Sequence, residues 1–152
     1  MKITTLCYLE HDGCYLMLFR NKKEADLNEG KWIGVGGHMT EGESPDECML
    51  REVYEETGLT LTRYDFLGVI SFISDRWEDE CMMLYRGTSF EGTVRTDCPE
   101  GELKWIPKNE VLNLPIWEGD RLFLEEMLRG ADRIRMKLMY EGDDLVGSVI
   151  YR

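Results

Sequence analysis

Apolar segments separated by short polar turns near both ends of the chain predict a β-hairpin at each end. Residues 3–9 and 14–20 are rich in apolar, aromatic and β-branched residues, and the Asp12-Gly13 pair between them favours a tight turn. Apolar residues then alternate with basic ones over 133–140, before the polar segment EGDD leads into LVGSVIY. This period-two pattern is typical of strands with one buried face.

The segment 45–57 has helical spacing and clear signals at both ends. Ser44 is a good N-cap, Pro45 suits the first helical position, and Glu47 completes a capping box with Ser44. Gly58 stands where a helix commonly ends in a left-handed residue. We therefore expect a helix that begins at Pro45 and ends just before Gly58.

Three further strands and a second helix are predicted after this helix. Residues 61–73, 80–90 and 102–106 are rich in β-branched and aromatic residues. Residues 118–129 carry apolar residues at helical spacing, with Gly130 as the stop. Hairpins mixed with two helices indicate an α+β fold with a mixed sheet.

Length and composition indicate one soluble domain spanning residues 1–152. The 152 residues and 17.8 kDa suit a single core, and the hydrophobic fraction of 43% is ordinary for a globular protein. No apolar run is long enough to cross a membrane, and the N-terminus has no signal-peptide pattern, so we expect a cytoplasmic protein. Five cysteines with no CxxC pair argue against a disulfide framework and against a thiolate zinc site.

A formal net charge of −12 makes polymeric nucleic acid an unfavourable partner. A small phosphorylated substrate remains compatible with this charge if cations lie between it and the protein. The sequence leaves open whether the chain is a monomer or a homodimer.

Three glutamates crowd one face of the predicted helix. Glu55 and Glu56 stand three and four residues after Glu52, a spacing at which like charges repel and destabilise a helix by a few tenths of a kcal/mol per pair. Arg51 can brace the cluster against Glu47 and Glu55, but it supplies only one positive charge. The acidic face is expected to look outward, and the other side carries the residues that anchor the helix on the core: Met49, Leu50, Val53 and Tyr54.

Two interpretations of the acidic face are open: a solvated surface, or a site for a divalent cation. Carboxylates without histidine or cysteine suit Mg²⁺ or Mn²⁺ better than Zn²⁺. The segment before the helix, WIGVGGHMTEGES, is a glycine-rich loop with a short apolar strand, and its backbone can bring main-chain oxygens close to a ligand. This context favours the cation site.

The spacing of these residues resembles the motif of the Nudix (MutT-like) pyrophosphohydrolases. That motif is a glycine, then a glutamate, then Arg-Glu followed by Glu-Glu and Gly-aliphatic at fixed intervals. It is met here by Gly37, Glu43, Arg51, Glu52, Val53, Glu55, Glu56, Gly58 and Leu59. The flanking segments KWIGVGG, ELKWI and LPIWEGDRLFL also look like the oxidised purine nucleoside triphosphatases of that family.

The resemblance implies an α/β/α sandwich and Mg²⁺-dependent release of pyrophosphate and a nucleoside monophosphate from a nucleoside triphosphate such as 8-oxo-dGTP. The metal ligands it implies are the Gly37 carbonyl and the carboxylates of Glu52, Glu55 and Glu56. Glu100 is favoured over Glu102 as an additional ligand. Glu55 and Glu56 both remain candidates for the general base, with Arg51 part of the same catalytic cluster.

The resemblance also implies substrate-binding residues. At the phosphate tail the expected cations are Arg20, Lys22 and Lys23, with His38 where a lysine is familiar. Trp117 and Asp120 correspond to the residues that hold the base. Ile33 stands where an asparagine commonly contacts the base, and Gly119 shortens the acidic pair beside Trp117.

The same residues leave two other functions open. The alternatives are hydrolysis of another nucleoside diphosphate derivative, such as ADP-ribose or a nucleotide sugar, and a non-catalytic nucleotide-binding regulator. A Ser-His-Asp hydrolase is disfavoured because His11 lies in a predicted turn and His38 in the loop before the acidic helix. The acidic residues also lack EF-hand spacing.

Overall fold

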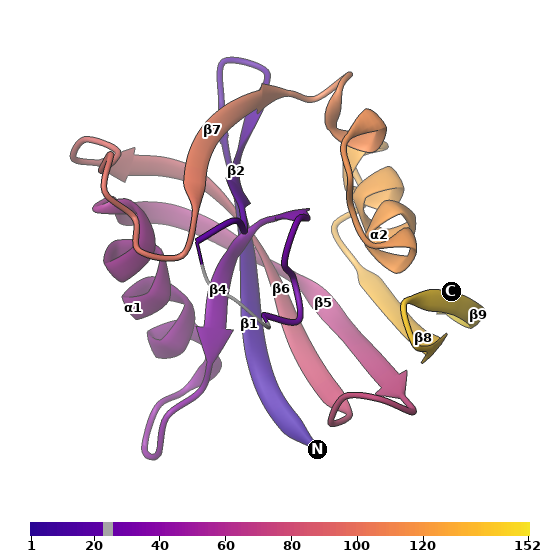
Figure 1. Ribbon diagram of the computed structural model, residues 1–152. Coiled ribbons are helices and arrows are strands. Elements are labelled where there is room, and N and C mark those ends of the chain that lie inside the picture. The colour runs from indigo at the N-terminus through magenta and orange to yellow at the C-terminus, as the bar shows by residue number, and fades with distance from the viewer. Residues whose placement is uncertain (23–25) are drawn as a thin grey trace.

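A twisted mixed β-sheet carries one helix on each of its faces (Figure 1). The computed structural model describes residues 1–22 and 26–152. The strands are β1 (Lys2–His11), β2 (Cys14–Phe19), β3 (Trp32–Ile33), β4 (Val35–His38), β5 (Thr60–Ser74), β6 (Glu80–Glu91), β7 (Glu102–Pro107), β8 (Ile134–Glu141) and β9 (Asp144–Tyr151). The helices are α1 (Pro45–Thr57), α2 (Glu118–Leu128) and the 3₁₀ turn η1 (Val111–Asn113).

The strand order is β3-β2-β1-β6-β5-β8-β9, with β4 also pairing β1 and β7 pairing β2. β1 and β6 are parallel, as are β5 and β8, whereas the two predicted hairpins, β1-β2 and β8-β9, are antiparallel. Asp12 and Gly13 both have positive φ, as a tight hairpin turn requires. The predicted α+β class with a mixed sheet is confirmed.

Helix α1 has the predicted ends. The Ser44 side chain accepts from the Glu47 N–H at 3.1 Å, and the Glu47 carboxylate accepts from the Ser44 N–H at 3.0 Å. Gly58 ends the helix with φ of 79°, and its N–H donates to the Tyr54 carbonyl. The helix bounds therefore follow from local capping chemistry.

The two faces of the sheet bury separate hydrophobic clusters, because successive side chains of a strand point to opposite faces. On β1, Leu6 and Tyr8 pack with Phe123 of α2, whereas Cys7 and Leu9 pack with Met49 and Val53 of α1. This produces the helix, sheet, helix layering that the sequence predicted.

Three details differ from the prediction. Tyr54 is 60% exposed and does not anchor α1, because it lies on the side turned away from the sheet. Glu56 is instead buried, so the acidic face does not look wholly outward. Helix α2 ends at Leu128, one residue early, although Gly130 has the positive φ expected of a stop.

The five cysteines lie within the described part of the chain. All five are free thiols: Cys7, Cys48 and Cys98 are buried, and Cys14 and Cys81 are partly so. Among the residues described, no helix is both long enough and apolar enough to cross a bilayer.

Candidate active site

Strand β4 lets α1 approach the sheet very closely through two glycines. A Cβ added to Gly37 would lie 2.6 Å from the Glu52 carboxyl carbon, and one added to Gly36 would lie 1.9 Å from the Thr5 carbonyl oxygen. The Gly36 N–H donates to Glu56 Oε2 at 2.9 Å. The missing side chain of Gly37 lets Glu52 of α1 reach the backbone of β4, whereas the missing side chain of Gly36 lets β4 lie close to β1.

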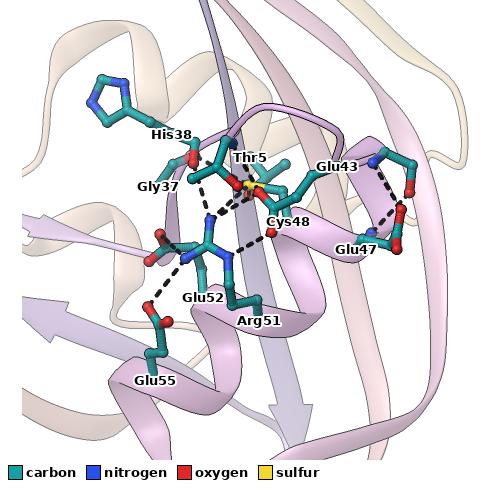
Figure 2. Close-up of polar contacts among 11 residues, drawn as sticks. Thr5, Gly37, His38, Glu43, Glu47, Cys48, Arg51, Glu52 and Glu55 are labelled. Atoms are coloured by element: carbon teal, nitrogen blue, oxygen red, sulfur yellow. Dashed lines mark hydrogen bonds and ion pairs between the residues drawn. The ribbon is translucent and has the colours of Figure 1, made fainter.

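Arg51 binds the acidic residues around it into one network (Figure 2). Its Nε and Nη2 donate to the two oxygens of Glu43 at 2.6 and 3.0 Å, and its Nη1 donates to Glu52 at 2.9 Å and Glu55 at 3.1 Å. Nη2 also reaches the His38 carbonyl at 3.2 Å. The hydrogen bonds from Arg51 lower the pKa of Glu43 to about 2. Arg51 thus braces Glu55 as predicted.

Glu47, the other predicted partner of Arg51, accepts from the backbone of Ser44 instead. A side chain at the third position of a helix reaches the N-cap more readily than the next turn. Glu43, in the loop before the helix, takes its place.

The three glutamates of α1 occupy different environments. The Glu55 side chain is 56% exposed and that of Glu52 is 17% exposed, whereas Glu56 as a residue is 6% exposed. The face of α1 that carries the three glutamates is therefore partly exposed to solvent and partly covered by β4.

Buried negative charge accumulates around Glu56. Burial raises the pKa of Glu56 well above its ordinary value, and a hydrogen bond with Glu100 and the charges of Glu100 and Glu52 raise it further. Burial likewise raises the pKa of Glu52, against the opposing effect of Arg51. Glu100 comes from the loop before β7, and its other partner is Arg20 Nη1 at 2.7 Å.

This donor set fits a hard divalent cation. It consists of oxygen ligands, and close carboxylates with raised pKa values are stabilised by a nearby positive charge. Among residues 1–22 and 26–152, no three acidic, histidine or cysteine side chains converge into a formed metal cluster, and Glu52 and Glu55 are held by Arg51 instead. The residues that can hold an ion are the Gly37 carbonyl and the carboxylates of Glu52, Glu55, Glu56 and Glu100. Of these, Gly37, Glu52 and Glu100 line one end of a cleft.

A cleft of about 480 Å³ runs from this acidic end across the sheet to Trp117 and Asp120 of the α2 segment. The Trp117 ring packs edge-on against Tyr140 and under the Lys31 ammonium, and its Nε1 donates to Asn28 Oδ1 at 2.8 Å. These contacts fix the indole at the cleft wall.

Asp120 is buried beside Trp117, and burial is the main cause that raises its pKa to about 8. The preceding Gly119 is constrained by Tyr140: its N–H donates to the Tyr140 hydroxyl at 2.7 Å, and a Cβ there would lie 2.6 Å from that oxygen. The absence of an acidic residue directly before Asp120 therefore has a packing reason.

Most of the predicted site residues meet in this cleft. Its lining includes Arg20, Ile33, Gly37, His38, Arg51, Glu52, Glu100, Trp117 and Asp120. Glu56 adjoins it through Gly36 and Glu100. Lys23 lies outside the described residues. Lys22 donates to the Cys98 carbonyl at 3.0 Å and, with Glu102, lines a separate groove.

Arg20, one of the cations expected at the phosphate tail, is buried and paired with two carboxylates. It is 8% exposed, and its guanidinium bonds Asp26 and Glu100, each at 2.7 Å. A buried guanidinium needs such partners because an unpaired charge is costly to desolvate. In the structure, Arg20 holds Glu100 beside Glu56.

Sequence reasoning did not identify Asn28, Phe72, Glu80 and Tyr140, which also line the cleft. Glu80 and Phe72 belong to strands that the sequence predicted, so their place on the sheet could be expected. The structure adds that they are directly paired, on β6 and β5. Asn28 lies in a loop with no such pattern, so only the folded chain reveals it.

Comparison with known proteins agrees with this geometry. Residues 3–127 match the family model described as NUDIX domain. The chain is 33% identical to the uncharacterized Nudix hydrolase YvcI of Bacillus subtilis over 140 residues, covering 90% of this chain and 85% of that protein. It is 27% identical to the oxidized purine nucleoside triphosphate hydrolase of Danio rerio over 147 residues, covering 95% and 90%.

Solved structures show the same fold. The mutator MutT protein from Bacillus halodurans superposes with a TM-score of 0.88 at 29% identity, covering 99% of this chain and 97% of that one. The NUDIX domain of Shewanella oneidensis NrtR complexed with ADP-ribose superposes at 0.68 with 22% identity, covering 86% and 87%.

Proposed function

The chain belongs to the Nudix family as a MutT-like pyrophosphohydrolase, and from that premise we propose that it is a Mg²⁺-dependent nucleoside triphosphate pyrophosphohydrolase. Water attacks the phosphate chain, and a nucleoside monophosphate and pyrophosphate leave. Its proposed role is the removal of oxidised purine nucleotides such as 8-oxo-dGTP, which is the substrate class named for its Danio rerio relative.

One observation carries the proposal: a single cleft joins the buried carboxylates near Gly37 to an aromatic wall at Trp117. The acidic end suits a cation-bound polyphosphate, and the aromatic end suits a flat base. A nucleotide has both parts, in the order that the cleft provides.

The proposed metal ligands are the Gly37 carbonyl and the carboxylates of Glu52, Glu55, Glu56 and Glu100. Mg²⁺, with Mn²⁺ as a substitute, would neutralise phosphate charge and polarise the phosphoryl oxygens. This allows a protein of net charge −12 to bind a polyanion.

The chain's own residues supply positioning and proton transfer. Arg51 fixes Glu52 and Glu55 from one side, and Arg20 fixes Glu100 from the other. Glu55 and Glu56 are both proposed as candidate general bases, because coupled carboxylates share their titration. Trp117 would stack on the base, with Asp120 hydrogen-bonded to its edge and His38 near the phosphates.

The test is a substrate panel with purified protein and Mg²⁺: 8-oxo-dGTP, dGTP, ADP-ribose and a nucleotide sugar. Release of pyrophosphate, rather than orthophosphate, from a triphosphate is the expected result, with 8-oxo-dGTP the best substrate. Faster cleavage of ADP-ribose or the sugar nucleotide would replace the proposed substrate. No turnover on the whole panel would indicate a non-catalytic nucleotide-binding protein.

A further inference from the structure

A charged residue, Glu80, sits in the floor of the cleft near the aromatic end. On the sheet it pairs with Lys2 of β1 and Phe72 of β5. Glu80 and Met82 are two residues apart on β6 and so share a face, and Met82 belongs to the apolar cluster beneath α2. A carboxylate in such a place needs an explanation, because burying a charge is costly.

The contacts of Glu80 occupy only some of the hydrogen-bond acceptor positions of its carboxylate. The Thr4 hydroxyl donates to Oε2 at 2.6 Å, and Lys2 Nζ lies 3.9 Å from Oε1, while the side chain is 17% exposed. A carboxylate has about four acceptor positions, so Oε1 can accept further hydrogen bonds from the cleft.

Asp120 provides a second, independent sign that a ligand belongs here. It is 5% exposed and lines the same cleft, and no side-chain hydrogen bond to its carboxyl occurs among residues 1–22 and 26–152. After burial, the charge of Glu80 is the next cause of its raised pKa. At neutral pH the buried Asp120 therefore offers a donor, and Glu80 offers an acceptor.

We propose that Glu80 is a specificity-determining residue, which accepts a hydrogen bond from an exocyclic amino group of the base held against Trp117. The proposal rests on the proposed function, because it places the base at this end of the cleft. A carboxylate only accepts hydrogen bonds, so it favours an amino group and disfavours a carbonyl or a hydrogen at the same position. A base without the amino group would leave the cleft-facing acceptor position of Glu80 desolvated and without a donor, and a buried polar group left in that way discriminates strongly between substrates.

The test compares substrates that differ only in an amino group. dGTP and dITP differ at the 2-amino group, and dATP and purine deoxyriboside triphosphate differ at the 6-amino group. For at least one pair, wild-type kcat/KM should favour the amino-bearing member by about 10- to 100-fold, as expected for a hydrogen bond to a charged group. Glu80→Gln should reduce that preference below about threefold, and Glu80→Leu should abolish it.

Glu91→Gln is the matched control, because Glu91 is an exposed glutamate at the other end of β6. It should keep the wild-type preference, and thermal unfolding should show that every variant is folded. The proposal is overturned if the wild type prefers neither amino-bearing member, or if both Glu80 variants keep the wild-type ratio.

A binding measurement separates this proposal from the catalytic one. The monophosphates of the same two pairs need no hydrolysis, so calorimetry reports base recognition alone. A preference for an amino-bearing monophosphate that is lost in Glu80→Gln, in a protein without turnover, would support Glu80 and reject the proposed reaction. Turnover with an unchanged preference in the variant would do the reverse.

Discussion

Replacing Glu56 by glutamine should make the metal-free protein more stable while removing its activity. Glu56 is 6% exposed, and the charges nearest to it include Glu100 and Glu52. Glutamine has nearly the same shape, and its amide oxygen can still accept the Gly36 N–H that now lies 2.9 Å from Glu56. At a pH at which Glu56 is ionised, the amide N–H of glutamine can donate to Glu100, which the carboxylate of Glu56 cannot do.

The size of the gain follows from these contacts. A hydrogen bond to a charged partner contributes about 1.5–3 kcal/mol, and the Gly36 bond loses about 1 kcal/mol when its acceptor becomes neutral. The net rise in the free energy of unfolding is about 0.5–2 kcal/mol. For a chain of this length that corresponds to about 1–8 °C in Tm.

Activity should change in the opposite direction. If Glu56 helps to hold Mg²⁺, turnover of the best nucleotide should fall by about 10³-fold or more. Mg²⁺ at ten times its dissociation constant should stabilise the wild type by about 1.4 kcal/mol. The same concentration should stabilise the variant much less.

Urea denaturation with EDTA and with Mg²⁺ measures both stabilities, and steady-state release of pyrophosphate measures the activity. Glu91→Gln, which removes an exposed charge outside the cleft, should change neither by a measurable amount. Equal stabilisation of wild type and Glu56→Gln by Mg²⁺, with unchanged turnover, would refute the assignment of Glu56 to the metal site. A loss of stability in EDTA would instead refute the account of its buried charge.

Three further predictions concern other parts of the cleft. Arg51→Lys keeps the positive charge but loses the two hydrogen bonds to Glu43. The free energy of unfolding should therefore fall by about 1–2 kcal/mol, and kcat/KM should fall by more than about tenfold. An unchanged kcat/KM would mean that the Arg51 network does not position Glu52. Gly37→Ala puts a methyl group 2.6 Å from the Glu52 carboxyl carbon, so the Mg²⁺ concentration for half-maximal activity should rise, and an unchanged metal titration would contradict this. Folding raises the pKa of Asp120 from 3.8 to about 8, so the folded protein keeps that proton to a higher pH than the unfolded chain does. The free energy of unfolding should therefore fall as the pH rises from 3.8 to about 8, by at most about 1.4 kcal/mol per pH unit. Asp120→Asn should lack this loss, and a difference in urea stability that stays constant between pH 5 and 8 would show that Asp120 does not titrate as described.

The sequence alone determined the features that depend on neighbouring residues. The ends of α1 follow from Ser44, Glu47 and Gly58, which cap the helix through bonds to its own backbone. The β1-β2 hairpin follows from Asp12-Gly13, whose turn needs no distant partner. The glutamate spacing is likewise local, and it was sufficient to identify the family and to predict the carboxylate cluster.

The tertiary structure decided what depends on burial and on contacts between distant segments. Neighbouring glutamates of one helix face differ in exposure because β4 covers Glu56 but not Glu55. Arg20, 80 residues from Glu100 in the chain, meets it only when β2 and β7 pair. The raised pKa of Asp120 and the place of Glu80 beside Lys2 arise in the same way. Desolvation and long-range pairing are properties of the packed chain, so no local pattern of residues encodes them by itself.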